Sequence, residues 1–422
     1  MNLTFRSATL LDPRSKFHNK QADISIKNGV IDQIGKNVKT IGKEIDAKGQ
    51  YISPGWFDLN CLFGDPGHEH KEDRITGAQA AAAGGFTGIA HLPNTNPVIE
   101  SKNDIAYLKA FNGNQVTDIH PIVAVTKGCL GDDLTEMIDL HQAGAIAFSD
   151  GVETIWNSDI LLKTLQYLQK FDGLLMNRSE DRTLNQFGTM NEGVQSTILG
   201  MKGMPNLAEE LAIARDLRIL AYTGGKIHFS TISTAESVKL IRKAKKQGLN
   251  VTCDVAAHNL ILDDSLIEDF DANLKVNPPL RTKKDIAALI KGLEDETIDA
   301  IVSAHNPQDE EGKKLEFDLA EFGHIGLQAV LPILVSISDK LPLEVTIPKL
   351  TSSPRRILKL EPATISVGQP ANLTLFDPKA QWILDDSSNK SKSRNSWYFG
   401  KQLKGKVVAT VNGKNTYFAD QY

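Results

Sequence analysis

The sequence predicts an α/β protein: a (β/α)8 barrel of the TIM type with a small β-sandwich domain composed of the N- and C-terminal segments. Two observations lead to this prediction. The middle of the 422-residue chain alternates strand-like and helical stretches, and both ends consist of strand-like stretches that turn at glycines. We expect residues 1–52 and 363–422 to form the β domain together, and residues 53–362 to form the barrel.

Alternating apolar and polar residues mark both ends of the chain. Apolar residues recur between Ile24 and Ile34, and the pair Asn28-Gly29 is a strong hairpin signal. Near the C-terminus, residues 371–376 and 406–411 have the same character, and Asn412-Gly413 precedes another short strand. Two all-β ends around a different middle indicate one domain built from both termini.

The middle of the chain has eight strand candidates separated by helical stretches such as 206–221 and 235–247. About 300 residues with eight β-α units fit a (β/α)8 barrel. A doubly wound open sheet is the alternative, but no G-x-G-x-x-G opens a helix. The strand candidates are residues 55–63, 87–92, 118–125, 145–149, 173–177, 226–230, 249–255 and 299–304.

Composition and charge exclude several classes of protein. Hydrophobic residues make up 41% and charged residues 23%, which is typical of a globular protein and excludes disorder and fibrous repeats. The formal net charge is −5 and no block of Lys and Arg stands out, which disfavours a general nucleic-acid binder. The apolar run 322–338 is interrupted by polar residues and glycines, so we interpret it as a buried helix and expect no membrane span.

Cysteine usage favours a reducing compartment. The three cysteines lie far apart and form no C-x-x-C pair, which argues against both a disulfide scaffold and a thiolate zinc site. The first 17 residues lack the apolar region of a secretory signal. We therefore expect a cytoplasmic protein, in which Cys61 and Cys253 are small buried residues.

Several blocks resemble, in order, those of the dihydroorotase family of cyclic amidohydrolases. That resemblance implies a zinc-dependent barrel that acts on a cyclic amide in pyrimidine biosynthesis. In such barrels the chemistry lies at the carboxyl ends of the strands. The blocks are residues 53–98, 177–181, 226–234, 254–260, 275–282, 303–308, 321–328 and 366–378.

The first motif of the family is replaced in this chain. The family has D-x-H-x-H-x-R at the end of the first strand, where two histidines hold metal and the arginine binds the substrate carboxylate. Here Asp58 is followed by Asn60, Leu62 and Gly64 at the three functional positions. Leucine has no lone pair for a metal, and glycine has no side chain to hold an anion.

The other catalytic positions of the family are replaced as well. Arg178 and Thr231 stand at two metal-binding histidine positions, and Ala304 stands where the family has an aspartate that binds metal and moves a proton. Asp150 is the one remaining good ligand among the matched positions. A hydrolytic zinc site needs about three or four donor side chains, so we predict no metal and no intact catalytic residue. We also predict that the Arg178 guanidinium pairs with Asp150.

Two nearby histidines, His68 and His70, could in principle form a relocated metal site. The flanking residues keep the family spacing without a gap, so both fall in the charged loop after the strand. We interpret them as residues of a plain surface loop.

Some polar residues of the family pocket are retained. Asn94 and Asn277 match substrate-contact positions, and His305 matches a retained histidine; with Asp150 they form the predicted remnant of the pocket. We expect these groups mainly to satisfy loop backbones, since the arginine and the metal that gave them a role are missing. His228 we interpret as a packed core histidine.

The leading hypothesis is a catalytically inactive dihydroorotase-like protein. The resemblance extends to non-catalytic homologues that partner aspartate transcarbamoylase, and it implies that role, as well as a homo-oligomer, here. The alternative is an active dihydroorotase, or a related cyclic amidohydrolase, with an atypical site. A third hypothesis is a binding module that senses a pyrimidine-pathway metabolite through Asn94, Asn277 and Arg178.

Overall fold

A barrel of eight parallel strands forms the centre of the computed structural model, which describes residues 1–419. Neighbouring strands follow one another in sequence order, and a parallel bridge between Cys61 and His305 joins the first strand to the segment after the last. The barrel predicted from the sequence is therefore confirmed. Its strands are β6 (Trp56–Cys61), β7 (Phe86–His91), β8 (Asp118–Val123), β9 (Ala147–Phe148), β10 (Leu175–Asn177), β13 (Ile227–Phe229), β14 (Val251–Ala256) and β15 (Ala300–Val302).

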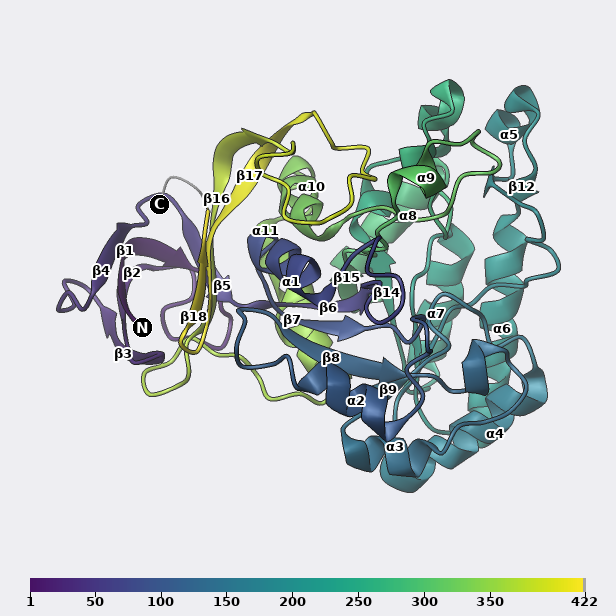
Figure 1. Ribbon diagram of the computed structural model, residues 1–422, viewed down its shortest axis with the longest axis horizontal. Coiled ribbons are helices and arrows are strands. Elements are labelled where there is room, and N and C mark those ends of the chain that lie inside the picture. The colour runs from purple at the N-terminus through teal and green to yellow at the C-terminus, as the bar shows by residue number, and fades with distance from the viewer. Residues whose placement is uncertain (420–422) are drawn as a thin grey trace.

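Helices surround the barrel (Figure 1). Their beginnings follow local sequence: Ser101 and Thr282 each form a capping box with an aspartate three residues later. The helices expected over 206–221 and 235–247 are present as α6 (Asn206–Thr223) and α7 (Ala235–Lys246). The others are α1 (Arg74–Ala83), α2 (Lys102–Lys109), α3 (Met137–Ala143), α4 (Ser158–Leu168), α5 (Val194–Leu199), α8 (Lys283–Glu294), α9 (Glu310–Lys313), α10 (Val330–Ser336), α11 (Leu343–Leu350) and α12 (Ser352–Ile357).

The helix expected over 322–338 is only partly correct. Its second half is α10, whereas residues before Leu327 form an irregular loop with Gly323 in a left-handed conformation (φ 136°). The loop approaches the backbone of Ser303 so closely that a Cβ on Gly326 would lie 2.1 Å from the Ser303 carbonyl oxygen. Close approach of this kind requires glycine. The result is that Phe322 and His324 reach the mouth of the barrel.

The second sheet combines both ends of the chain. Its strands run in the order β18-β17-β16-β5-β1-β2-β3, and β4 pairs with β1. In Figure 1 the C-terminal strands stand between the N-terminal strands and the barrel. Antiparallel pairing of Leu373 with Pro54 and of Leu375 with Ile52 joins the two segments. The strands are β1 (Asn2–Leu10), β2 (Gln21–Lys27), β3 (Val30–Gly35), β4 (Lys43–Asp46), β5 (Tyr51–Pro54), β16 (Asn372–Ile383), β17 (Gln402–Asn412) and β18 (Asn415–Phe418).

Strand β5 spans the position, between residues 52 and 53, at which we expected the first domain boundary. It pairs with β1 and β16 in the β domain, and β6 of the barrel begins two residues after it. The chain thus passes from one sheet to the other with a single intervening residue, Gly55. The boundaries at 52/53 and 362/363 stay predictions.

Apolar side chains fill the barrel beneath the site. Phe57, Leu59, Ile122, Met176 and Val302 are buried in one cluster that occupies the barrel interior. Close packing of this kind makes the barrel a solid support for the loops above it. Among residues 1–419, no helix is long and apolar enough to cross a membrane.

Candidate functional site

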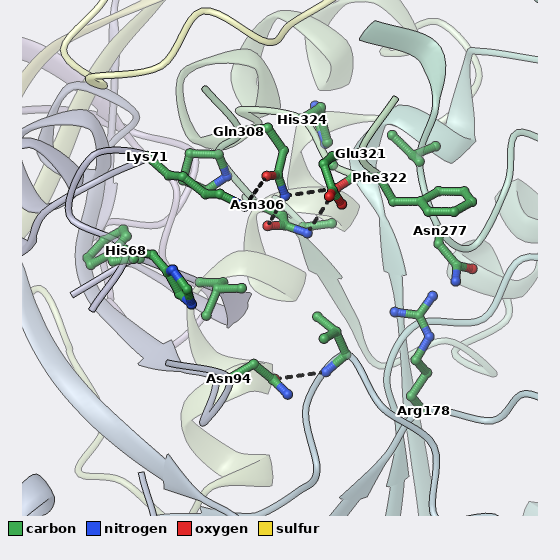
Figure 2. A pocket seen from close by; sticks show the side chains of 18 of the residues that line it. His68, Lys71, Asn94, Arg178, Asn277, Asn306, Gln308, Glu321, Phe322 and His324 are labelled. Atoms are coloured by element: carbon green, nitrogen blue, oxygen red, sulfur yellow. Dashed lines mark hydrogen bonds between the residues drawn. The ribbon is translucent and has the colours of Figure 1, made fainter. Parts of the chain in front are cut away.

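A cavity of about 380 Å³ opens at the carboxyl ends of the barrel strands (Figure 2). Leu62 and Gly64 after β6, Arg178 after β10 and Ala304 after β15 contribute to its lining. All four stand at positions where the resemblance implies metal or substrate contacts. The structure therefore brings together four of the six replaced positions, while Asn60 and Thr231 lie outside the cavity lining.

Gly64 leaves no space for the missing arginine. A Cβ at this position would lie 2.0 Å from the carbonyl oxygen of His68 and 2.9 Å from that of Glu72. The loop closes on Gly64 through hydrogen bonds from the Gly64 amide to Glu72 and from the His68 amide back to Gly64. Any side chain at position 64 would require the loop of residues 64–72 to move.

Asn60 belongs to a chain of hydrogen bonds across the barrel. Its amide donates to Ser230 Oγ (3.2 Å), and Ser230 Oγ donates to Asp254 Oδ2 (2.6 Å). The same oxygen lies 2.9 Å from His228 Nε2, whose other ring nitrogen lies 2.8 Å from Thr252 Oγ1. His228 is fully buried, as expected of a packed core histidine. These side chains thus form hydrogen bonds with one another in the region where the family motif would place metal ligands.

Asp58 lies beside this chain and is also fully buried. Its carboxylate accepts hydrogen bonds from the backbone amide and the hydroxyl of Ser303 and from the backbone amide of Asn60. Burial raises the pKa of Asp58 to about 7, although these hydrogen bonds oppose the shift. At neutral pH the carboxyl group therefore holds its proton for part of the time.

The predicted ion pair between Arg178 and Asp150 is wrong. Arg178 Nε lies 3.2 Å from Glu180 Oε2, a partner two residues along the chain. Asp150 accepts hydrogen bonds from the amides of Val125 (3.0 Å) and Thr126 (2.9 Å) and from the Thr126 hydroxyl (2.6 Å). Its carboxylate is thus held by the loop after β8, and burial raises the pKa of Asp150.

The residues present do not fit a zinc site of the kind that the family resemblance implies. Within residues 1–419, no three or more His, Cys, Asp or Glu side chains gather so that they could hold a metal ion. The five replaced metal positions offer an amide, a hydroxyl, two apolar groups and a cation. Zinc binds to neutral imidazole, thiolate and carboxylate groups, usually three or four together.

Comparisons with known proteins agree along the whole length of the chain. A dihydroorotase of Pelotomaculum thermopropionicum is 39% identical over 427 residues, which cover 100% of this chain and 99% of that protein. A dihydroorotase of Acetivibrio thermocellus is 39% identical over 97% of this chain and 98% of its own length. The family model described as "Dihydro-orotase-like" matches residues 49–237. The chain belongs to the dihydroorotase family.

Solved structures of a hydantoinase and a dihydropyrimidinase share the architecture. L-hydantoinase (dihydropyrimidinase) from Arthrobacter aurescens superimposes with a TM-score of 0.86 at 22% identity, over 100% of this chain and 97% of that one. Dihydropyrimidinase from Brevibacillus agri NCHU1002 gives a TM-score of 0.83 at 20% identity, over 100% and 96% of the two chains. At this identity the likeness concerns the fold alone.

Of the four residues predicted as the remnant of the dihydroorotase pocket, two line the cavity. Asn94 lines the cavity, but its Nδ2 donates to the Asp150 carbonyl (3.0 Å) and its Oδ1 accepts from the Val152 amide (2.9 Å). It thus satisfies the hydrogen-bonding groups of the loop backbone, as expected. Asn277 also lines the cavity, but it donates to Glu180 Oε2 (3.2 Å) rather than to backbone.

The other two remnant residues, Asp150 and His305, lie outside the cavity lining. His305 is 1% exposed, and its Nδ1 accepts a hydrogen bond from the Gly326 amide (3.3 Å). Its segment forms bridges with Cys61 and His324, so the residue continues the barrel wall. His305 therefore lies behind the cavity lining, with its Nε2 3.6 Å from Glu72 Oε2 and its ring centroid 6.0 Å from that of the lining residue Phe63.

The loop that contains His68 and His70 is only partly a plain surface loop. His70 is exposed and lies 3.6 Å from Asp309. His68 lines the cavity together with Lys71, whose Nζ donates to Gln308 Oε1 (2.7 Å; Figure 2). The turn at Gly64 brings this part of the loop back over the barrel mouth, which residue spacing did not indicate.

Two lining histidines were not predicted. His258 follows β14, and His324 lies in the irregular loop before α10; their rings meet edge to face with centroids 4.3 Å apart. Burial lowers the pKa of His258 to about 3 and also lowers that of His324. Both stand in sequence blocks shared with the family, 254–260 and 321–328, and a histidine just after a barrel strand was the signal that could have identified His258.

Proposed function

We propose that this chain is a dihydroorotase-like protein of the cytoplasm that does not carry out metal-dependent hydrolysis. The observation that carries the proposal is the set of side chains at the metal positions: Asn60, Leu62, Arg178, Thr231 and Ala304. A permanently charged guanidinium in place of a ligand opposes a divalent cation. The protein then acts in pyrimidine biosynthesis through its fold rather than through its own chemistry.

The proposed role is that of a structural partner of aspartate transcarbamoylase in an oligomeric assembly. The resemblance to non-catalytic dihydroorotase homologues is its basis. One surface feature supports a partner-binding role: Val194 and Ile198, four residues apart on α5, are 74% and 70% exposed. Exposed apolar residues on one helical face are typical of interaction surfaces.

A second candidate is an active dihydroorotase or related cyclic amidohydrolase with an atypical site. The comparisons support this candidate more directly than the first, because the similar proteins over the full length are dihydroorotases. The open cavity at the barrel mouth also supports it. Such an enzyme would have to hydrolyse its substrate without the ligand set that the family motifs supply.

Metal content and hydrolysis of dihydroorotate distinguish the two candidates. The dihydroorotase of Pelotomaculum thermopropionicum, purified and assayed in the same way, provides the positive control. We expect less than about a tenth of an equivalent of zinc per chain after zinc supplementation and dialysis, and no hydrolysis above background. Hydrolysis that a chelator abolishes and zinc restores would establish the second candidate.

Co-purification tests the structural role. Aspartate transcarbamoylase of the same organism is co-expressed with the tagged chain, and the complex is analysed by size-exclusion chromatography. We expect a stable complex that the double variant Val194→Lys, Ile198→Lys weakens, because the new charges would have to be buried. The matched control is Tyr222→Lys, at an exposed apolar residue on α6. Separate elution of the two native proteins would refute the partnership.

A further inference from the structure

The Arg178 side chain ends in an unpaired fork at the cavity. Nε is used in the contact with Glu180, and the side chain is 10% exposed. Nη2 is buried without a hydrogen-bond partner, and no bond to Nη1 occurs within residues 1–419. In Figure 2 the guanidinium end points up into the pocket beside Asn277. Buried donors of this kind are costly to leave unpaired.

His258 presents a second unpaired group to the same cavity. The residue is 3% exposed, and neither ring nitrogen has a hydrogen-bond partner. Because burial holds its pKa near 3, the ring is neutral at pH 7 and offers one N–H donor and one acceptor. The cavity thus has unpaired donors on two elements, which a hydrogen-bond acceptor could satisfy.

The lining has as many cations as anions, so a bound carboxylate would depend on Arg178 itself rather than on the net charge of the cavity. Lys71 and Arg178 are the lining cations, and Figure 2 shows them on opposite sides of the pocket. Glu153 and Glu321 are lining anions, both exposed. A dianion next to Arg178 would find no second cation there, whereas a carboxylate matches the two parallel N–H groups of a guanidinium edge.

The rest of the lining favours a compact apolar body. Leu62 and Ala304, which replace metal-binding positions, face the cavity together with Val276 and Phe322. A volume of about 380 Å³ is ample for a molecule of one ring. Carboxylate at one end and a ring against these side chains would use both parts of the lining.

We propose that the cavity binds a small monocarboxylate, without a metal ion, through the Nη1/Nη2 edge of Arg178. The position that carries a metal ligand in the family motif becomes an anion-binding position in this chain. The apolar residues at two further metal positions receive the body of the ligand. This proposal concerns binding alone and stands whether or not the chain partners aspartate transcarbamoylase.

Calorimetric titration with two matched probes tests the proposal. Benzoate carries the carboxylate, and benzamide has nearly the same shape without the charge. Chelated, full-length protein should bind benzoate and not benzamide. Arg178→Gln should weaken benzoate binding by about ten- to hundredfold, the range expected for hydrogen bonds to a charged group. Circular dichroism verifies that the variant is folded.

Arg218→Gln is the matched control, because Arg218 is exposed on α6 and the net charge changes equally. It should change the benzoate affinity by less than about twofold. Equal binding of benzoate by the Arg178→Gln variant would overturn the proposal. So would the absence of binding to benzoate, acetate and orotate at about 10 mM, or binding of inorganic phosphate alone.

Arg178→Lys distinguishes the contribution of the paired guanidinium donors to binding from that of the positive charge, since lysine keeps the cation but lacks the planar pair of donors. We expect benzoate affinity between those of the native chain and Arg178→Gln. Affinity equal to that of the native chain would contradict the proposed two-point contact.

Discussion

At the scale of single residues, Asp58 links stability to pH. Its pKa in the folded chain is about 7, raised by burial from 3.8. Below pH 3.8 both folded and unfolded chains hold the proton, and between 3.8 and about 7 only the folded chain does. Above that range the folded chain carries a buried charge. The Asp58 contribution therefore lowers the free energy of unfolding as pH rises, by roughly 4 kcal/mol in total.

Asp58→Asn should remove this dependence, because an amide stays neutral and can keep the hydrogen bonds to Ser303. Relative to the native chain, the variant should gain roughly 2–3 kcal/mol of unfolding free energy between pH 5 and pH 8. Urea unfolding at the two pH values measures the difference. Asp339→Asn, at an exposed residue, is the control and should show no such gain. A constant difference between variant and native chain would contradict the assigned pKa.

The sequence indicated many of the residues that lie at the site, but it did not indicate several of their contacts. The replaced positions follow from the resemblance to the family motifs, which match this chain over short, local stretches of sequence. The Arg178 partner was wrong because Glu180 lies within reach along the same loop, while Asp150 is already held by Val125 and Thr126. Such competition between partners depends on loop paths, and so does the placement of His68.

At the scale of elements, Arg281 connects several segments through hydrogen bonds. It is 2% exposed; its Nη1 donates to Asn191 Oδ1 (3.0 Å) and to the Met204 carbonyl (2.7 Å), and its Nε donates to Ser233 Oγ (3.0 Å). Asn191 and Met204 lie in the two short strands β11 (Met190–Asn191) and β12 (Gly203–Met204). Glu209 of α6 lies 3.8 Å from Nη2.

Arg281→Met should therefore destabilise the protein by about 3–5 kcal/mol, because the buried Glu209 loses its cation and several acceptors lose a donor. The unfolding free energy in urea measures the loss. Arg218→Met, on the exposed side of α6, should cost less than about 0.5 kcal/mol. Equal stability of the two variants would show that the Arg281 contacts contribute nothing to the fold.

Elements with a strong sequence period were predictable, and irregular ones were not. The pattern over 206–221 and 235–247 gave α6 and α7 almost residue for residue. The apolar run 322–338 gave a helix that begins only at Val330. Tertiary contacts of Gly323 and Gly326 with Asn306 and Ser303 hold the first part in a loop, and apolar content alone contains no information on such contacts.

At the scale of the whole molecule, the hydrogen bonds around Asn60, Ser230 and Asp254 connect strand β6, the residue after β13, and strand β14 without an ion. The fold should therefore be independent of metal. We expect the thermal unfolding midpoint to change by less than about 1 °C after chelation or zinc addition, since a ligand that does not bind the folded state cannot stabilise it. Differential scanning calorimetry measures the midpoint. A fall on chelation that zinc reverses would demonstrate a metal site.

The pairing of β5 with β16 has a consequence for synthesis of the protein. Strand β5 cannot pair with β16 until Leu375, the partner of Ile52 and more than three hundred residues later in the chain, has been synthesised. At about 5–20 residues per second, the N-terminal strands spend on the order of 15 to 65 s on the ribosome with an open edge. Unpaired edges of this kind attract other strands. Nascent chains of this protein should therefore depend on chaperones that cover the first fifty residues until translation ends.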